Sequence, residues 1–210
     1  MNGPAFRRAV ADAAADALAD FASDRLLPAL AGDEVTRERL LRAMADSEHA
    51  AHGTFRRWAD DEPDPDARAT FEAVARQEAD HRDRVLAVLD EPYEPADGGP
   101  LHTYLRSRSD TVQRLAAGLV ARPLVSVASY GRLIEHFESE GDADAVTLAR
   151  DLRAETDEIV EDGLAHLEER CDDEADWERG RLAAEYAVRV AHDDFEDGLR
   201  SAGVESEGTG

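Results

Sequence analysis

The chain has 210 residues, with 48 acidic residues against 24 basic ones and a formal net charge of -24. Every basic residue is an arginine, because the sequence contains no lysine. This balance argues against direct nucleic-acid binding, since proteins hold phosphate backbones with clusters of Lys and Arg. No apolar run approaches the roughly 18 residues of a membrane span, and no signal-peptide pattern is present. We therefore expect a cytoplasmic protein with no membrane partner.

Composition also indicates the fold class. Hydrophobic residues make up 42% of the chain, with many alanines among them, while aromatic residues reach only 6%. Closely packed helices suit such a composition better than a β-sandwich does, so we expect an all-α protein. The length fits one domain, over about residues 1–200. A single cysteine, Cys171, excludes an intramolecular disulfide and a Cys-based zinc site.

Proline and glycine residues divide the chain into seven predicted helices. In chain order these helices cover about 4–31, 33–61, 66–90, 101–121, 124–140, 143–170 and 173–200. Four of them, at about 34–61, 66–90, 124–140 and 143–170, are expected to form an antiparallel four-helix core. The remaining N-terminal, middle and C-terminal helices would be additions to that core. Residues 201–210 are expected to be a disordered tail.

The sequence Glu78-x-x-His81 interrupts an otherwise apolar helical stripe. Glu48 lies on a similar stripe of the preceding helix, because steps of three and four residues return to one helix face. A buried carboxylate beside a buried imidazole is costly unless both are paired or bind a metal. One Glu with a Glu-x-x-His forms half of a di-iron site in four-helix bundles. Glu48, Glu78 and His81 are therefore the predicted ligands of non-haem iron.

A weak internal repeat indicates where a second half-site would lie. Aligning residues 47–55 with 129–137 places Tyr130 opposite Glu48. When a shorter second turn is allowed for, Glu78 matches Glu155 and His81 matches Glu158. That second half lacks the expected Glu and Glu-x-x-His pattern. On the predicted stripe of the helix over 143–170, Glu155, Asp162 and His166 could supply replacement ligands. The sequence thus predicts one or two iron ions, with Glu155 and His166 as candidate ligands of the second.

Both half-sites have alternative interpretations. Glu48, Glu78 and His81 could form a buried hydrogen-bonded network, for example with an arginine, that persists after metal binding was lost. Glu155, Asp162 and His166 could be a solvated helix flank, because carboxylates are frequent throughout this chain. The protein would then be a non-enzymatic interaction protein. Its first, fourth and seventh helices could offer surfaces to a partner or to a second copy in a homodimer.

The segments Ala45-Asp-Ser-Glu-His-Ala-Ala and Ala75-Arg-Gln-Glu-Ala-Asp-His resemble ferritin-like proteins of the rubrerythrin type. The resemblance covers residues 34–90 and, more weakly, 124–170. It implies an antiparallel four-helix core, non-haem iron, and peroxidase or oxidase chemistry. Rubrerythrin proper carries a Cys-rich module, which a chain with one cysteine lacks, so the resemblance implies an external electron donor.

The acidic, lysine-free composition is similar to that of cytoplasmic proteins from salt-in halophilic archaea, whose surfaces stay soluble in molar salt. The whole chain also resembles a group of halophilic archaeal proteins labelled as transcription antitermination proteins. A transcription-associated role is therefore a further expectation for the non-enzymatic alternative. The acidic surface favours a form of that role without direct RNA binding.

Overall fold

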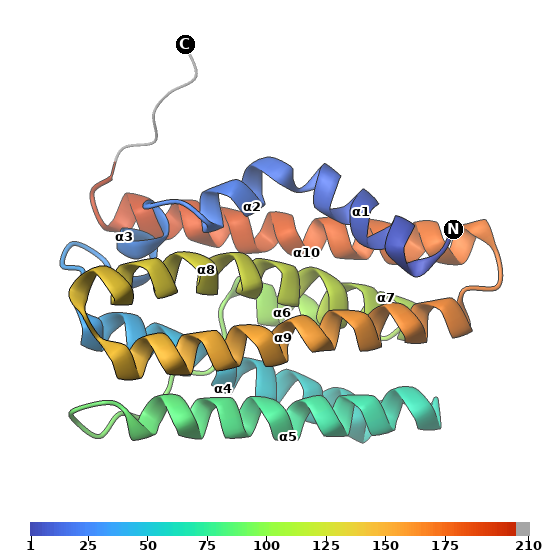
Figure 1. The fold of residues 1–210 in the computed structure, drawn as a ribbon. Coiled ribbons are helices and arrows are strands. Elements are labelled where there is room, and N and C mark those ends of the chain that lie inside the picture. Colours follow the sequence, from blue (N-terminus) through green and yellow to red (C-terminus); the bar gives the residue numbers. More distant parts are fainter. Residues whose placement is uncertain (205–210) are drawn as a thin grey trace, which may run out of the picture.

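The computed structural model describes residues 1–204, and all regular secondary structure in that part of the chain is helical (Figure 1). The predicted all-α fold is confirmed. The elements are α1 (Gly3–Ala13), α2 (Ala15–Phe21), α3 (Leu26–Ala31), α4 (Arg37–Asp61), α5 (Pro65–Ala87), α6 (Pro100–Arg106), α7 (Thr111–Arg114), the π-helical segment η1 (Leu115–Ala121), α8 (Arg122–Glu140), α9 (Ala143–Arg170) and α10 (Glu174–Ser201). Within residues 1–204, no helix combines the length and the apolar character needed to cross a membrane.

Helices α4 and α5 form a tight antiparallel pair, which lies along the lower side of the molecule in Figure 1. The Thr36 hydroxyl caps α4 by accepting a hydrogen bond from the Arg39 amide. Only residues 62–64 separate the two helices, and the Asp64 carboxylate caps α5 by accepting bonds from two backbone amides. Pro65 at the first position of α5 suits this start, since no helical partner exists there for its missing N–H. Such a short connection requires the helices to pack side by side.

Helices α8 and α9 form the second pair of the core, and α9 also contacts α5. Gly141 ends α8 in the left-handed conformation, with φ 75°, and the Asp142 side chain then caps α9. The two pairs therefore create the interior in which residues from α4, α5 and α8 meet.

The chain before α8 differs from the prediction of one helix over 101–121 that ends before Pro123. The break lies at residues 107–110, where the Asp110 side chain accepts a bond from the Gln113 amide and begins a new helix. From Thr111 the helix continues through η1 and Pro123 to Glu140. In the wider π-turns a backbone amide donates to the carbonyl five residues earlier, as the Arg122 amide does to the Ala117 carbonyl. This change of register accommodates a proline with no N–H to donate.

The predicted single helix over 4–31 is also wrong, because three short helices occupy that segment. After α2, the Ser23 hydroxyl donates to the Asp20 carbonyl and accepts from the Arg25 amide, which stabilises a turn in place of further helix. Helices α1 to α3 run beside the long helix α10 (Figure 1). The α3–α10 contact is close at Gly198, where an added Cβ would lie 2.5 Å from the Ala29 carbonyl oxygen.

The predicted disordered tail is partly contradicted. Helix α10 ends at Ser201, and the Val204 amide then donates a 3.0 Å hydrogen bond to the Leu199 carbonyl. Val204 also packs against the core. Residues 201–204 are therefore ordered, while the rest of that prediction, over 205–210, lies outside the described residues.

Candidate metal centre

Helices α4 and α5 bring Glu48, Glu78 and His81 together in the interior. Their exposed fractions are 2%, 0% and 0%. His81 Nδ1 lies 3.6 Å from Glu48 Oε2 and 4.0 Å from Glu78 Oε2. One ligand atom from each residue lies within 4.8 Å of the others, so the group could hold a metal ion. These separations suit an ion with bonds of about 2 Å to nitrogen and oxygen.

Glu155 binds the outer nitrogen of His81. His81 Nε2 is 2.8 Å from Glu155 Oε2, and Arg84 donates to both oxygens of the same carboxylate at 2.9 and 3.0 Å. An ionised carboxylate only accepts hydrogen bonds, so Nε2 carries the proton and Nδ1 faces Glu48 and Glu78. The prediction of Glu155 as a metal ligand is not met by this geometry. The residue instead orients the imidazole, a role that carboxylates often have behind metal-binding histidines.

The predicted ligand His166 lies outside the group of Glu48, Glu78 and His81. Its Nε2 atom is 2.6 Å from the Thr70 hydroxyl, and Arg170 donates to its Nδ1 atom at 3.1 Å. The reason is the helical phase of α9, whose interior side differs from the predicted stripe. Asp162 and Glu158 are exposed. The buried residues of its central part are Leu152, Thr156, Ile159, Val160 and Gly163.

Arg122 enters the same interior from the start of α8 and is only 3% exposed. Its Nη1 and Nη2 atoms donate to Glu78 Oε1 and Oε2 at 2.7 and 3.0 Å, and Nη2 lies 3.7 Å from Glu48 Oε2. Sequence reasoning anticipated an arginine in general terms and did not identify this residue. The signal is an arginine within the otherwise apolar run over 115–125, apart from Pro123. A two-pronged pair of this kind gives both strength and orientation.

Tyr130 of α8 holds the other buried carboxylate. Its hydroxyl donates to Glu48 Oε1, and the side chain is 4% exposed. Burial raises the pKa of Tyr130 well above its usual value, and the Glu48 charge raises it further. The phenol therefore stays protonated and can donate. In the sequence repeat, Tyr130 occupies the position that corresponds to Glu48. A neutral hydrogen-bond donor therefore replaces the second carboxylate expected there.

The buried charges shift one another's ionisation. Burial and repulsion from Glu48 raise the pKa of Glu78 to about 8. The Arg122 charge opposes this rise but only partly offsets it. Burial also acts to raise the pKa of Glu48, but the nearby Glu78 and His81 side chains and the Arg122 charge lower it overall. For His81, burial opposes protonation, yet the surrounding carboxylates raise its pKa. One carboxylate of the pair thus binds a proton far more readily than the other.

Three buried polar atoms in this interior make no hydrogen bond with the described residues. They are Glu48 Oε2, His81 Nδ1 and Arg122 Nε. Buried polar atoms in folded proteins are almost always paired, so each such atom requires an explanation. A cation between Glu48 Oε2 and His81 Nδ1 would satisfy both of those atoms at once.

The chain matches no protein-family model, no curated protein and no solved structure in the comparisons made. Function is therefore inferred from the chemistry of the site itself.

A second group with metal-ligand spacing, Asp20, His192 and Glu196, joins the end of α2 to α10 near the surface. His192 Nε2 lies 2.8 Å from Asp20 Oδ2, and Arg25 donates to Asp20 and to Glu196 at 2.7 Å each. Each carboxylate already has a cationic partner, so this group is a polar clamp between helices. The interior group differs because two of its ligand atoms, Glu48 Oε2 and His81 Nδ1, make no hydrogen bond.

Proposed function

We propose that this protein is a rubrerythrin-like, ferritin-like helical bundle that binds one non-haem iron ion through Glu48, Glu78 and His81. The observation that carries the proposal is the pair Glu48 Oε2 and His81 Nδ1, which are buried, 3.6 Å apart and without hydrogen bonds. Since Nε2 donates to Glu155, the lone pair of Nδ1 is directed at two carboxylates. That arrangement is repulsive unless a proton or a metal ion lies between the atoms.

The ligand atoms favour a transition-metal ion of intermediate hardness. Two carboxylates and one imidazole combine oxygen ligands, which suit Mg²⁺ and Mn²⁺, with a nitrogen ligand, which suits Fe²⁺ and Zn²⁺. Three protein ligands leave coordination positions open, as redox-active iron requires. The resemblance of the Glu48 and Glu78-x-x-His81 segments to rubrerythrin-type proteins adds to this preference for iron.

The position of Arg122 favours a site for one metal ion over a site for two. In di-iron bundles, carboxylates from both helix pairs surround two ions. In this chain the guanidinium contacts both oxygens of Glu78 and lies beside Glu48. It supplies a fixed positive charge at the side of the site where a second ion would need its own ligands. Tyr130, which replaces a carboxylate there, would bind a second ion poorly, because its pKa is raised and its phenol stays neutral.

Iron at this site would supply one-electron redox chemistry toward peroxide or oxygen. The surrounding residues would determine its ligand geometry. Tyr130 donates to Glu48 Oε1 and so leaves Oε2 for the ion, while Glu155 fixes the orientation of His81. Cys171 is the only cysteine, so the chain has no Cys-rich electron-transfer site of its own. Electrons would come from an external donor.

Metal stoichiometry tests the proposal directly. Protein purified in molar salt and supplied with Fe²⁺ under anaerobic conditions should retain about one metal ion per chain by mass spectrometry. The double variant Glu78→Gln/His81→Gln should lose it, because two of three ligands are removed. The control Glu72→Gln/His136→Gln removes the same residue types outside the group and should retain the metal. Equal metal content in both double variants, with helical content preserved by circular dichroism, would contradict the site.

A second candidate function is a non-enzymatic interaction protein with a degenerate metal site. The bidentate Arg122–Glu78 pair favours it, since a guanidinium already neutralises one of the buried carboxylates. Protonation of His81, whose pKa is raised, would balance the other without any metal. Wild-type protein that takes up neither Fe²⁺, Mn²⁺ nor Zn²⁺ would support this candidate over the first.

A further inference from the structure

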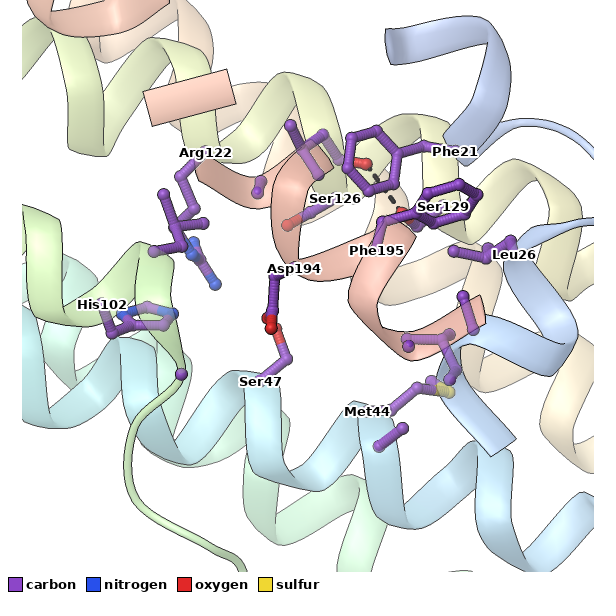
Figure 2. A pocket seen from close by; sticks show the side chains of 18 of the residues that line it. Phe21, Leu26, Met44, Ser47, His102, Arg122, Ser126, Ser129, Asp194 and Phe195 are labelled. Carbon is purple, nitrogen blue, oxygen red and sulfur yellow. Dashed lines mark hydrogen bonds between the residues drawn. The ribbon is translucent and has the colours of Figure 1, made fainter. Parts of the chain in front are cut away.

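A cavity of about 480 Å³ adjoins the buried charged network on the side of α10. Helices α4, α8 and α10 surround it, and α3 and α6 complete its wall (Figure 2). Its volume lies within the range typical of small-molecule sites. Most of the wall is apolar, formed by side chains that include Phe21, Leu26, Met44, Leu101, Val125 and Phe195. Glu48, Arg122 and Tyr130 also line the cavity, so it reaches the network from which the candidate metal centre is built.

Asp194 differs from the other charged residues that line this cavity. Arg122 is paired with Glu78, and Glu48 accepts from Tyr130. Asp197 is paired with Arg200. Among residues 1–204, Asp194 takes part in neither a side-chain hydrogen bond nor an ion pair. Asp194 is exposed at the mouth of the cavity, and the desolvation of its inner side together with the Asp197 charge raises its pKa.

The surroundings of Asp194 leave room for a charged group. Asp194 from α10 and Ser47 from α4 point toward one another at the mouth of the cavity, where both are exposed (Figure 2). The loop before α6 contributes Gly99, with φ 91°, and a Cβ at that position would lie 3.9 Å from Asp194 Oδ2. The Gly99 backbone therefore lies next to the carboxylate without crowding it. A carboxylate and a hydroxyl facing each other can accept hydrogen bonds from one ammonium group, which has three donors.

The same cavity is unfavourable for anions. Its only lining guanidinium, among the described residues, is that of Arg122, which is already bound to Glu78 on both prongs. His102 also lines the cavity, but burial and the charges of Arg122 and Arg106 lower its pKa to about 3, so it is neutral. A carboxylate or phosphate would thus meet several negative charges and no unpaired cation. An apolar wall with one unpaired carboxylate instead matches a ligand with a hydrocarbon body and a positive end.

We propose that this cavity binds a small amphiphilic amine, with its ammonium group at Asp194 and its hydrocarbon body against the apolar wall. Glu48 lines both this cavity and the candidate metal centre, but Asp194 contributes no ligand atom to that centre. Binding should therefore occur in protein that has been stripped of metal by a chelator.

The chain offers a convenient reporter for this test. It contains only two methionines, Met44 in the cavity wall and Met1, which is 60% exposed. In metal-free protein labelled with [methyl-¹³C]methionine, n-octylamine should shift the Met44 resonance saturably and leave the Met1 resonance in place. Octan-1-ol has the same chain without the charge and should bind about tenfold more weakly, and octanoate should cause no saturable shift. An unmoved Met44 resonance, or equal affinity for the alcohol and the amine, would overturn the proposal.

Two variants separate the charge from the cavity. Asp194→Asn should weaken n-octylamine binding about tenfold and leave octan-1-ol binding unchanged. Asp193→Asn removes the same charge from the neighbouring exposed position of α10, outside the cavity, and should leave both affinities unchanged. Ser126→Leu places a larger side chain in the cavity wall and should abolish binding of both ligands. If Asp194→Asn and Asp193→Asn bind the amine equally well, the assignment of the ammonium group to Asp194 is wrong.

Discussion

Arg122 and Glu78 face each other in the interior of the bundle, with two guanidinium nitrogens 2.7 and 3.0 Å from the two carboxylate oxygens. The pair joins the start of α8 to the middle of α5, and both side chains are almost completely buried. Because Arg122 also lies 3.7 Å from Glu48, it is the principal cation for both carboxylates in the absence of metal. The stability of the metal-free protein should therefore depend strongly on this residue.

Replacing Arg122 with methionine tests that dependence. Arg122→Met keeps an unbranched side chain but leaves Glu78 without its cation, and removing one partner of a buried ion pair typically costs about 3–5 kcal/mol. Urea unfolding of metal-free protein above pH 8, where Glu78 is ionised, should show a loss of that size. Arg150→Met removes an arginine whose ion pair with Glu138 is exposed, and it should change stability by less than about 1 kcal/mol. Similar losses in the two variants would contradict the central role of Arg122.

Tyr130→Phe should destabilise the protein by removing the hydroxyl that donates to Glu48 Oε1. A buried carboxylate oxygen would then lack a donor, which costs about 1–3 kcal/mol. The matched change Tyr186→Phe affects a tyrosine that is 49% exposed and should have little effect on the free energy of unfolding. Both values can be measured by urea titration of metal-free protein. The assigned contact would be wrong if Tyr130→Phe were as stable as the wild type.

Two glycines within helices should respond in opposite directions to alanine. An added Cβ at Gly163 of α9 would lie 2.6 Å from Leu119 Cβ and 3.0 Å from the Leu119 carbonyl oxygen. Gly163→Ala should therefore force α9 away from η1, at a cost of about 1–3 kcal/mol. At Gly131 of α8 no atom lies within 4 Å of the added Cβ, so Gly131→Ala should stabilise the protein by roughly 0.5–1 kcal/mol. Thermal unfolding of the two variants, side by side, measures both changes.

His102 should make stability depend on pH. Its folded-state pKa is lowered to about 3 by burial and by Arg122 and Arg106, so the unfolded chain binds a proton more readily than the folded one. The neutral side chain contributes stability above about pH 6.5 that is lost as pH falls toward 3. At pH 5 the loss is about 2 kcal/mol, from about 1.5 pH units at 1.36 kcal/mol each.

The variant His102→Gln isolates this effect from the many carboxylates of the chain. Glutamine can donate to the Thr54 hydroxyl, which is 3.0 Å from His102 Nδ1, but does not titrate. Urea unfolding between pH 7.5 and 5 should show a loss in the wild type that exceeds the loss in the variant by about 2 kcal/mol. Equal losses in both proteins would mean that His102 is protonated in the folded state.

Much of the first half of the site could be predicted from local spacing. Glu78 and His81 are one helical turn apart, so their shared face results from the period of the helix. Glu48 joins them because residues 62–64 allow only a tight turn, and α4 must then pack against α5. Neither step requires knowledge of the rest of the molecule.

The second half of the site depended on which faces of α8 and α9 point inward. The sequence does not specify that face once the preceding helix departs from regular α-geometry. The π-helical turns over Leu115–Ala121 rotate α8 relative to α7, and this rotation places Arg122 and Tyr130 inward. The packing of α9 against η1 at Gly163 likewise selects a buried face that excludes Asp162 and leaves Glu155 at the edge. These outcomes result from contacts between segments far apart in the chain.

The sequence by itself determined the all-α class, the α4–α5 hairpin and the three ligand candidates on it, because helix period and turn length act over short distances. Only the tertiary structure decided that Arg122 pairs with Glu78, that Glu155 holds the outer nitrogen of His81, and that α10 closes a cavity beside Glu48. Partner choice for a buried charge depends on which groups share the interior. The packing of all the helices decides which groups share the interior. The residue pattern of a single helix does not determine it.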